Sequence, residues 1–371
     1  MSKIRVLHID SSEVWGGGQS QITTLIRDSA NLPIEHFLAS PKNSKLWYKV
    51  RQNISGYCQL PRSGALNPLA MIRLRNYCLK NKIQILHTHC GKSHTFAYWV
   101  KTLFMPQITL VVHRRIPAKI RSNWLSRVKF TGPAVDRFIA VSDYIKSVLQ
   151  RGGIEPGRIT TIRSSKKPFP CDEHVRDEAR AELLRMKGLA PDGDFFILSA
   201  SRLVPDKGLF ILIEGFRTLV RERPGARLII AGEGPLSSKL KVAGRAMLES
   251  GHLVMPGFCK DVPRLLLGSD VFAIPSLSEG LGSTIVEAMM AKTAVVGSSV
   301  EGIPELIRHG QTGLLAPPGD AESLYSLFLD LAVDPALRKK LAEQGHKWAL
   351  SSCSSDTMVE KTFNLYKSVL Y

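Results

Sequence analysis

The sequence has 371 residues, of which 44% are hydrophobic and 22% charged, a composition that excludes an intrinsically disordered chain and predicts two or three folded domains. Its six cysteines include no CxxC pair, which argues against a disulfide scaffold or a zinc ribbon and favours a reducing, cytoplasmic environment. The net charge of +18 lies in the first half, where residues 1–171 hold 27 Lys and Arg against 7 Asp and Glu.

Such a basic half attracts polyanions, so its partner is expected to be nucleic acid, an anionic membrane or a phosphorylated substrate. No acidic residue lies between Glu35 and Asp136, although 17 Lys and Arg occur there. A surface charged only for solubility is the alternative, but solubility does not require so long a segment without carboxylates.

Short β-forming runs alternate with amphipathic stretches along the first half, a pattern typical of α/β proteins. Arg5 and His8 interrupt the N-terminal apolar run, which therefore predicts a first strand and not a signal peptide. No apolar run approaches the roughly 18–20 residues of a membrane-spanning helix. The predicted strands are Ile4–Ile9, Glu35–Ala39, Gln84–Thr88, Thr109–Val112 and Arg137–Val141, and helices are predicted at Gln19–Ser29, Pro68–Lys80 and Ser142–Arg151.

The second half repeats this alternation and predicts a second doubly wound sheet. Turn-forming residues gather near 165–192, where the charge balance also changes, and this segment predicts the join between the domains. The predicted strands are Phe195–Ser201, Arg227–Ala231, Leu253–Met255, Val271–Ile274, Ala294–Gly297 and Gly313–Leu315, and helices are predicted at 208–223, 235–249, 261–268, 284–291, 303–308 and 320–332.

The predicted fold class is therefore α/β, with two Rossmann-like doubly wound parallel-sheet domains. We expect the domains at residues 1–168 and 169–352. The stretch 353–371 has apolar residues at helical spacing and predicts a C-terminal helix that packs on the first domain.

A glycine run follows the first predicted strand. Gly16, Gly17 and Gly18 precede a predicted helix, where backbone N–H groups and the helix N-terminus can face an anion. The run is not GxGxxG, and no acidic residue follows at the spacing of a ribose contact, so a dinucleotide site is disfavoured. A tight turn that binds nothing fits the pattern equally well.

Two strand–loop–helix segments in the second half hold a more specific set of residues. The loop in 199–208 holds Arg202 and Lys207, a planar fork and a point charge that together suit a diphosphate. In the segment 273–291, a glycine loop again precedes a helix, and Glu279 and Glu287 flank the helix start. A carboxylate at such a place is a good acceptor for two ribose hydroxyls.

The glycine loop of this second segment predicts a phosphate site. Gly280 and Gly282 allow the backbone to approach a phosphate at the helix N-terminus. Ser283 or Thr284 is expected to cap that helix.

These motifs, in this order, resemble the retaining GT-B glycosyltransferases of family 4, also called glycosyltransferase group 1. The resemblance covers nearly the whole chain and implies two Rossmann-like domains that face a cleft. The segments that carry it are SRLVPDKG (201–208), AGEGP (231–235), the run 257–276, the paired glutamates Glu279 and Glu287, and the V-x-GIPE segment that begins at residue 300.

The resemblance also implies roles for individual residues. Arg202 and Lys207 match the family's diphosphate-binding pair, and Glu287 matches its ribose-binding glutamate. Glu279 matches the glutamate beside the donor sugar, and His113 matches the cleft histidine, so both are expected to act in catalysis. The other matches on the donor side are Gly17, Gly18, Gly257, Phe258, Gly280, Leu281, Gly282 and Ser283.

Three features concern the acceptor side and the hinge. His89 matches a family histidine that is structural or contacts the acceptor. Arg114 and Arg115 follow His113 directly, and this basic pair predicts contact with an anionic acceptor. The residues 163–165 replace the Asn-Gly that the family usually has between its domains, so the hinge is expected to differ.

The resemblance implies transfer of a sugar from a nucleotide-diphosphate sugar to a hydroxyl of a glycan or lipid-linked acceptor, with retention by same-face attack. The expected process is bacterial lipopolysaccharide or other surface-glycan synthesis. The only D-x-D is residues 192–194, in the predicted linker, so we expect neither a metal nor another cofactor. Instead, Arg202, Lys207 and a helix N-terminus are expected to neutralise the leaving diphosphate.

Two other classes of protein are weighed against this one. The first is another enzyme on the same fold, such as a sugar-nucleotide epimerase or a phosphorylase, although no pyridoxal-binding lysine is identifiable for the latter. The second is a nucleic-acid-binding protein, which the pI of about 9.8 suggests. The chain lacks a zinc knuckle, an RNP-like aromatic run and a basic heptad helix, so no nucleic-acid partner is expected.

The segment 113–130 predicts contact with an anionic membrane, because cationic and apolar residues are interleaved there. We therefore expect a cytoplasmic enzyme that binds the inner face of the cytoplasmic membrane peripherally. The alternative places Trp124 and Phe130 in the core. The apolar residues of the segment are Ile116, Ile120, Trp124, Leu125, Val128 and Phe130, and its cations include Arg121, Arg127 and Lys129.

Overall fold

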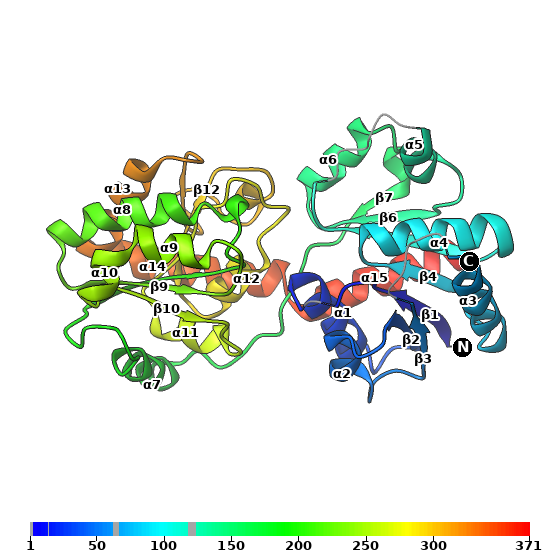
Figure 1. The fold of residues 1–371 in the computed structure, drawn as a ribbon, viewed down its shortest axis with the longest axis horizontal. Coiled ribbons are helices and arrows are strands. Elements are labelled where there is room, and N and C mark those ends of the chain that lie inside the picture. Colours follow the sequence, from blue (N-terminus) through cyan, green and yellow to red (C-terminus); the bar gives the residue numbers. More distant parts are fainter. Residues whose placement is uncertain (1–2, 14, 62–66, 118–123) are drawn as a thin grey trace. The chain divides into compact units, whose positions relative to one another are not determined.

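A computed structural model describes residues 3–13, 15–61, 67–117 and 124–371, without the side chains of residues 124–126. The chain forms two compact units (Figure 1). Unit 1 comprises Met1–Lys167 and Ser354–Tyr371, and unit 2 comprises Pro168–Cys353. The observed boundaries differ by one residue from those that the sequence predicts.

Unit 1 contains a parallel sheet of seven strands in the order β3-β2-β1-β4-β5-β6-β7. All five predicted strands are present, but β5 continues two residues further and includes His113 and Arg114. The sequence does not predict β3 and β7, because short strands at the two edges of the sheet carry little periodicity. The strands are β1 (Ile4–Ile9), β2 (Ile34–Pro41), β3 (Gly56–Leu60), β4 (Ile85–Thr88), β5 (Thr109–Arg114), β6 (Arg137–Ala140) and β7 (Ile159–Thr161).

The sequence predicts three of the six α-helices that the structure describes within residues 1–167, and side-chain caps hold the first turns of two of these three. Asn67 accepts a hydrogen bond from the backbone N–H of Ala70 at 3.1 Å, and Ser142 does the same for Ile145 at 3.1 Å. The helices are α1 (Gly17–Asp28), α2 (Lys45–Val50), α3 (Pro68–Lys80), α4 (Gly91–Phe104), α5 (Trp124–Thr131) and α6 (Asp143–Arg151), with a 3-10 turn at Pro156–Arg158.

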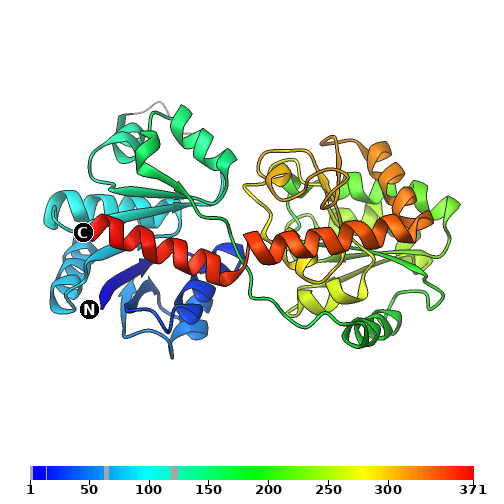
Figure 2. The ribbon, with the colours of Figure 1, turned by 180° about the vertical axis from the view of Figure 1, so that it is seen from behind.

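The C-terminal helix α15 (Ser355–Leu370) lies along the sheet of unit 1 (Figure 2). It buries Met358 and Tyr366 in a cluster that includes Val6 of β1. The hydroxyl of Tyr366 lies 2.6 Å from Nδ1 of His87 on β4. Both apolar packing and a buried hydrogen bond therefore hold α15 in place.

The side-chain amide of Gln21 holds the last residues of unit 1 before the chain enters unit 2. Gln21 on α1 donates to the carbonyl of Ser165 at 2.8 Å and accepts from its backbone N–H at 2.9 Å. Arg163 pairs with Asp143 at 2.7 Å. These bonds hold the segment that replaces the expected Asn-Gly.

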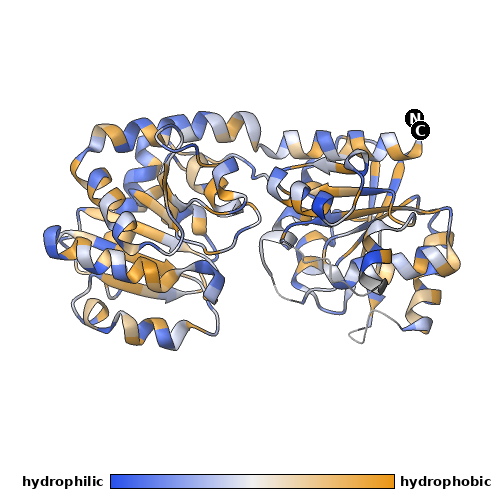
Figure 3. Cartoon of the chain, turned by 90° about the horizontal axis from the view of Figure 1, so that it is seen from above, coloured by the Kyte–Doolittle hydropathy of each residue, from blue (hydrophilic) through white to orange (hydrophobic). Residues whose placement is uncertain are grey.

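Unit 2 contains a parallel sheet of six strands in the order β10-β9-β8-β11-β12-β13. All six predicted strands are present, with ends shifted by up to two residues. Their apolar runs lie at the centre of the unit, as Figure 3 shows in orange, and this burial on both faces is typical of parallel sheets. The strands are β8 (Phe195–Ala200), β9 (Ala226–Ala231), β10 (Leu253–Gly257), β11 (Val271–Ile274), β12 (Ala294–Ser298) and β13 (Leu314–Ala316).

The helices of unit 2 match the prediction except in four places. The sequence does not predict α7 or α14, residues 235–249 form two short helices, and residues 303–305 form only a 3-10 turn. The helices are α7 (Glu173–Leu184), α8 (Leu209–Glu222), α9 (Ser237–Ala243), α10 (Arg245–Glu249), α11 (Val262–Gly268), α12 (Ser283–Met290), α13 (Ala321–Val333) and α14 (Pro335–Ser352), and the 3-10 turns are Pro205–Lys207 and Ile303–Glu305.

Each sheet has one point at which the strand order reverses. In unit 1 this point lies between β1 and β4, and in unit 2 it lies between β8 and β11. Loops at the carboxyl ends of such strand pairs form the binding crevices of open α/β sheets. The loops after these four strands therefore position the candidate sites.

Candidate active site

Two loops of unit 2 meet at the switch point between β8 and β11. The backbone N–H of Leu277 donates to the carbonyl of Asp206 at 2.8 Å, which joins the loop after β11 to the loop after β8. Lys207 and Glu279 form an ion pair across this junction, and both side chains are about four-fifths buried. The structure thus brings together two of the predicted site residues.

A third loop, after β12, supports the glutamate of this pair. The carboxylate of Glu301 accepts hydrogen bonds from the backbone N–H of Glu279 at 2.7 Å and from the hydroxyl of Ser278 at 2.8 Å. The next residue, Gly302, donates its N–H to the carbonyl of Glu279 at 3.1 Å. A Cβ at Gly302 would lie 2.1 Å from the carbonyl oxygen of Gly280, so only glycine permits this approach.

Sequence reasoning missed Glu301. The backbone of this residue has a conformation that is unusual for a loop residue with a side chain. Its φ of 49° lies in the left-handed region that a glutamate rarely adopts. A strained residue next to a site is an indication of function. Its position in the V-x-GIPE motif was the available signal.

The helix α12 begins beside Glu279, and the capping prediction for it is wrong. Its N-cap is Gly282, with a φ of 86°, and Ser283 is the first helical residue. Among the described residues, no side chain caps this helix. Its N-terminal backbone N–H groups are therefore open to an anion. Thr284 and Glu287 lie half-buried on the same face of the helix as Ser283.

The remaining donor-side candidates lie on other loops of unit 2. Arg202 is exposed in the same loop as Lys207. Phe258 follows β10 and is 53% exposed, which leaves an aromatic ring face accessible. Leu281, in contrast, is buried and supports the glycine loop between Gly280 and Gly282.

The first-half candidates gather at the carboxyl ends of β1, β4 and β5. Arg115 follows β5, and its guanidinium lies beside Gly18, at the start of α1. One of its terminal nitrogens contacts Nδ1 of His89 at 3.1 Å and Nδ1 of His113 at 3.2 Å. Burial lowers the pKa of Arg115 to about 10, which leaves the guanidinium charged at neutral pH.

His113 is a buried residue within β5. Burial and the charge of Arg115 hold the pKa of this imidazole well below its usual range, so it is neutral. Its Nε2 has no hydrogen-bond partner among the described residues. A buried nitrogen of this kind is available to a ligand.

A buried carboxylate completes this group. Asp10 follows β1, and its Oδ2 accepts a hydrogen bond from Gln19 at 2.8 Å. Its Oδ1 has no hydrogen-bond partner in the described part of the chain, and burial raises the pKa of the group. Sequence reasoning did not select Asp10, because a single acid at a strand end carries no spacing signal.

Arg114 does not stand with Arg115, which corrects the expectation of a basic pair. It lies in β5, is buried, and stacks on Phe130 at 5.4 Å from the ring centroid. Successive strand residues point to opposite faces of a sheet, and this separates the two arginines. Arg115 lies instead beside Gly18, at the start of α1.

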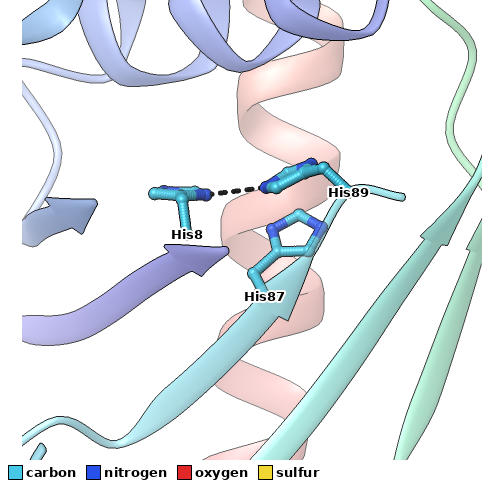
Figure 4. Close-up of side chains that lie close together, drawn as sticks. All are labelled: His8, His87 and His89. Carbon is cyan, nitrogen blue, oxygen red and sulfur yellow. Dashed lines mark hydrogen bonds between the residues drawn. The ribbon is translucent and has the colours of Figure 1, made fainter. Parts of the chain in front are cut away.

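Three buried histidines lie close enough to hold a metal ion by distance alone (Figure 4). One ring nitrogen of each of His8, His87 and His89 lies within 4.8 Å of the others. His8 Nδ1 and His89 Nε2 are 3.0 Å apart, and His8 Nε2 lies 2.9 Å from Nδ1 of His36. His8 and His89 therefore belong to a hydrogen-bonded network with His36, whereas His87 pairs with the hydroxyl of Tyr366.

The predicted membrane segment is only partly described. Ile120 and Arg121 lie outside the described residues, as do the side chains of Trp124 and Leu125. Phe130 is 4% exposed and belongs to the core, so that part of the prediction is wrong. Ile116, Arg127 and Val128 are exposed. Over the described ranges, no helix is both long enough and apolar enough to cross a bilayer.

Two parallel-sheet units with loops gathered at their switch points define a GT-B fold, the architecture of many enzymes that transfer sugars. Comparison with family models agrees. Residues 15–164 match the model described as Glycosyltransferase Family 4, and residues 181–348 match the model described as Glycosyl transferases group 1. The chain belongs to this family of glycosyltransferases.

Individual relatives and solved structures support the assignment. EpsD of Bacillus subtilis, a provisionally assigned glycosyltransferase, is 26% identical over 96% of this chain and 89% of its own length. The lipopolysaccharide core biosynthesis glycosyltransferase LpsE of Rhizobium meliloti is 31% identical over 57% of this chain and 55% of its own.

Two crystal structures share the fold. A glycosyltransferase from Rickettsia africae has a TM-score of 0.85 at 18% identity and covers 100% of this chain and 99% of its own. Alr3699/HepE of Anabaena, crystallised in complex with UDP, has a TM-score of 0.84 at 18% identity and covers 98% of this chain and 100% of its own.

Proposed function

We propose that this glycosyltransferase moves a sugar from a nucleotide-diphosphate sugar to a hydroxyl of a glycan or lipid-linked acceptor, with retention at the anomeric carbon. The process is bacterial surface-polysaccharide synthesis, such as that of lipopolysaccharide. The names of LpsE and of the amylovoran glycosyltransferase AmsK of Erwinia amylovora, 37% identical over 37% of this chain, support that process. The UDP bound to HepE makes a uridine nucleotide the first donor to test.

The observation that carries this proposal is the junction of three loops in unit 2. Lys207, Glu279 and the uncapped start of α12 come together at the sheet's switch point. Before the donor binds, Glu279 is the counter-ion of Lys207. A bound diphosphate supplies the negative charge instead, and Glu279 is then released to accept hydrogen bonds from the donor sugar.

Charge stabilisation at the leaving group supplies most of the catalysis. Negative charge develops on the diphosphate as its bond to the anomeric carbon breaks. Lys207, Arg202 and the N–H groups that begin α12 neutralise that charge in a partly dehydrated site. These groups take the place of a metal ion, and Glu287 holds the ribose hydroxyls.

Retention follows from attack on the face that the diphosphate leaves. The bond from the anomeric carbon to the diphosphate oxygen breaks as the bond to the acceptor oxygen forms. The acceptor proton passes to the departing phosphate oxygen, so no protein nucleophile is needed. His113 donates a hydrogen bond from Nε2 to the donor sugar, and Arg115 binds an anionic group of the acceptor.

Release of nucleoside diphosphate that depends on an added acceptor is the test of this function. UDP, GDP and ADP are first ranked by thermal shift, because a ligand at 100 times its Kd adds about 2.7 kcal/mol of stability. Release of UDP from UDP-sugars is then measured with and without glycan acceptors. Release that ignores the acceptor favours an epimerase or hydrolase, and no thermal response to any of the three nucleotides refutes the donor assignment.

Contact with an anionic bilayer is the second part of the proposal, and the helix α3 supports it better than α5 does. Leu69, Ile72 and Leu79 are exposed on α3, although its opposite side is buried in the core. Arg73 and Lys80 lie exposed on the same helix. An amphipathic surface of apolar groups beside cations suits the interface of an anionic bilayer, where each cation contributes about 1 kcal/mol.

Co-sedimentation with vesicles tests the bilayer contact. The wild-type chain is expected to pellet with phosphatidylglycerol-containing vesicles at low salt and to be released at high salt. The variant L69S/I72S/L79S is expected to stay in the supernatant, whereas V242S/V333S, which changes exposed apolar residues of unit 2, pellets like the wild type. Equal pelleting of both variants contradicts the assignment to α3.

A further inference from the structure

Arg115 determines where two imidazoles carry their protons. An arginine side chain only donates hydrogen bonds. Its Nη2 lies 3.1 Å from Nδ1 of His89 and 3.2 Å from Nδ1 of His113, and its Nη1 donates to the backbone carbonyl of His89 at 3.1 Å. Both Nδ1 atoms must therefore be unprotonated acceptors, so each neutral ring carries its hydrogen on Nε2.

The proton position on His89 then determines the donor and the acceptor in three more side chains. His89 donates from Nε2 to Nδ1 of His8 at 3.0 Å, and His8 donates from Nε2 to Nδ1 of His36 at 2.9 Å. His36 donates from Nε2 to the hydroxyl of Ser29 at 2.7 Å. Ser29 donates to the carbonyl of Leu25 at 2.5 Å, inside α1.

This chain of hydrogen bonds closes at both ends. It begins at the guanidinium of Arg115, which can only donate hydrogen bonds, and it ends at the carbonyl oxygen of Leu25, which can only accept them. Each of the four groups between them supplies one hydrogen and accepts one, so all five links are satisfied. An added proton on any ring would place two N–H groups against each other. Each of these four side chains is at least nine-tenths buried.

The same arrangement argues against a metal ion at His8, His87 and His89. A metal would need the lone pair of His89 Nε2, but the bond from Arg115 to Nδ1 leaves the hydrogen on Nε2. A divalent cation would also enter a buried region that already holds the charge of Arg115, with Asp10 as the nearby carboxylate. Burial of uncompensated charge is costly.

We infer that His8 and His36 are positioning residues, which hold His89 and Arg115 in place, and that Arg115 in turn presents His113 as an N–H donor. Five segments of unit 1 contribute these residues: the strands β1, β2 and β5 and the loops after β4 and β5. The catalytic consequence rests on the proposed function, in which His113 donates from Nε2 to the donor sugar. The proton positions do not rest on it.

Nitrogen NMR of the full-length chain, labelled with 15N-histidine, tests the proton positions without any substrate. We expect His8, His36, His89 and His113 to be neutral rings with the hydrogen on Nε2, and to remain so after addition of zinc chloride. In R115M, His89 and His113 are expected to exchange between the two neutral forms. A hydrogen on Nδ1 of His89 or His113 in the wild type, unchanged rings in R115M, or a zinc-induced shift of His8 and His89 overturns the inference.

Kinetics of two variants at the remote end test the positioning role. H36N keeps an oxygen acceptor for His8, whereas H36L removes it. We expect H36L to lower kcat about 10-fold or more with little change in KM, because a small displacement of a reacting group costs this much. H36N is expected to restore most of the rate. Equal loss in both variants, or a loss confined to KM, shows a merely structural histidine. Absence of transfer in the wild type would refute the proposed function and leave the NMR result intact.

Discussion

Lys207 and Glu279 form an ion pair although 72 positions separate them in the sequence. Adjacent parallel strands bring their loops to the same edge of the sheet, and the bond from Leu277 to Asp206 holds those loops together. Each side chain thus holds the other in place before substrate arrives. Under the proposed function this pair is a preorganised site, because little rearrangement is needed for a diphosphate to replace the carboxylate as the partner of Lys207.

Removal of the lysine tests this role directly. K207A is expected to lower kcat about 100- to 1000-fold, because one preorganised charge at the leaving group is lost. Turnover of a UDP-sugar, or of whichever donor thermal shift identifies, is the measurement. K239A, which changes an exposed lysine on α9, is the matched control and should retain full activity. Wild-type turnover in K207A would contradict the diphosphate assignment.

Substitutions of Glu287 and Glu279 are expected to have different effects on nucleotide binding. E287Q should weaken binding of the sugar-free nucleotide about 10- to 100-fold, because a charge-assisted hydrogen bond to the ribose is weakened. E279Q should bind that nucleotide nearly as the wild type does but turn over the intact donor slowly. Calorimetry with the nucleoside diphosphate decides, and equal losses in the two variants would refute the division of roles.

Glu301 is expected to matter for rate although it is a positioning residue. In E301A the backbone N–H of Glu279 loses its acceptor, which costs about 1–3 kcal/mol of stability and displaces the catalytic loop. We expect kcat to fall about 10- to 100-fold. E301Q keeps an oxygen acceptor and should lose less in both measurements. If E301A keeps full turnover, Glu301 does not position Glu279.

Chelation tests the source of charge neutralisation. Transfer is expected to persist in excess EDTA, because Lys207, Arg202 and the start of α12 supply the positive charge that a metal would otherwise provide. Initial rates with and without EDTA are compared at constant ionic strength. A complete loss that magnesium restores would show that these groups are insufficient.

Stability of unit 1 is expected to fall in mild acid. Burial lowers the pKa of six of its imidazoles, that of His36 to about 4. The unfolded chain, with a histidine pKa near about 6.5, then binds more protons than the folded chain. The stabilisation is complete above about pH 6.5 and is lost as the pH falls toward 4, at up to about 1.4 kcal/mol per pH unit for each ring. The six rings are His8, His36, His87, His89, His94 and His113.

Tryptophan fluorescence measures this loss, because four of the five tryptophans lie in unit 1. Burial raises the pKa of Asp10, which acts in the opposite direction, but it is one group against six. The urea midpoint of the tryptophan signal should therefore fall between pH 7 and pH 5. A midpoint that stays constant over this range would show that the histidine pKa values are the same in the folded and the unfolded chain.

The sequence by itself determined the alternation of strands and helices, the two-unit fold class and the glycosyltransferase family. These features depend on local patterns: β-branched runs, capping residues, and motifs such as the loop that holds Lys207. The helices α7 and α14 escaped prediction, and Ser283 was assigned a capping role that Gly282 holds. Such boundaries depend on φ and on neighbouring loops, which composition does not reveal.

Only the tertiary structure decided which distant residues meet. The strand order brings the carboxylate of Glu301 to the backbone N–H of Glu279. It places His89, His8 and His36, from three segments, in one line of hydrogen bonds that starts at Arg115. It also buries Arg114 while Arg115, its neighbour, contacts the histidines. The physical reason is that hydrophobic periodicity fixes the face on which a side chain lies, whereas the partners of a polar side chain follow from the order and register of strands that are far apart in the sequence.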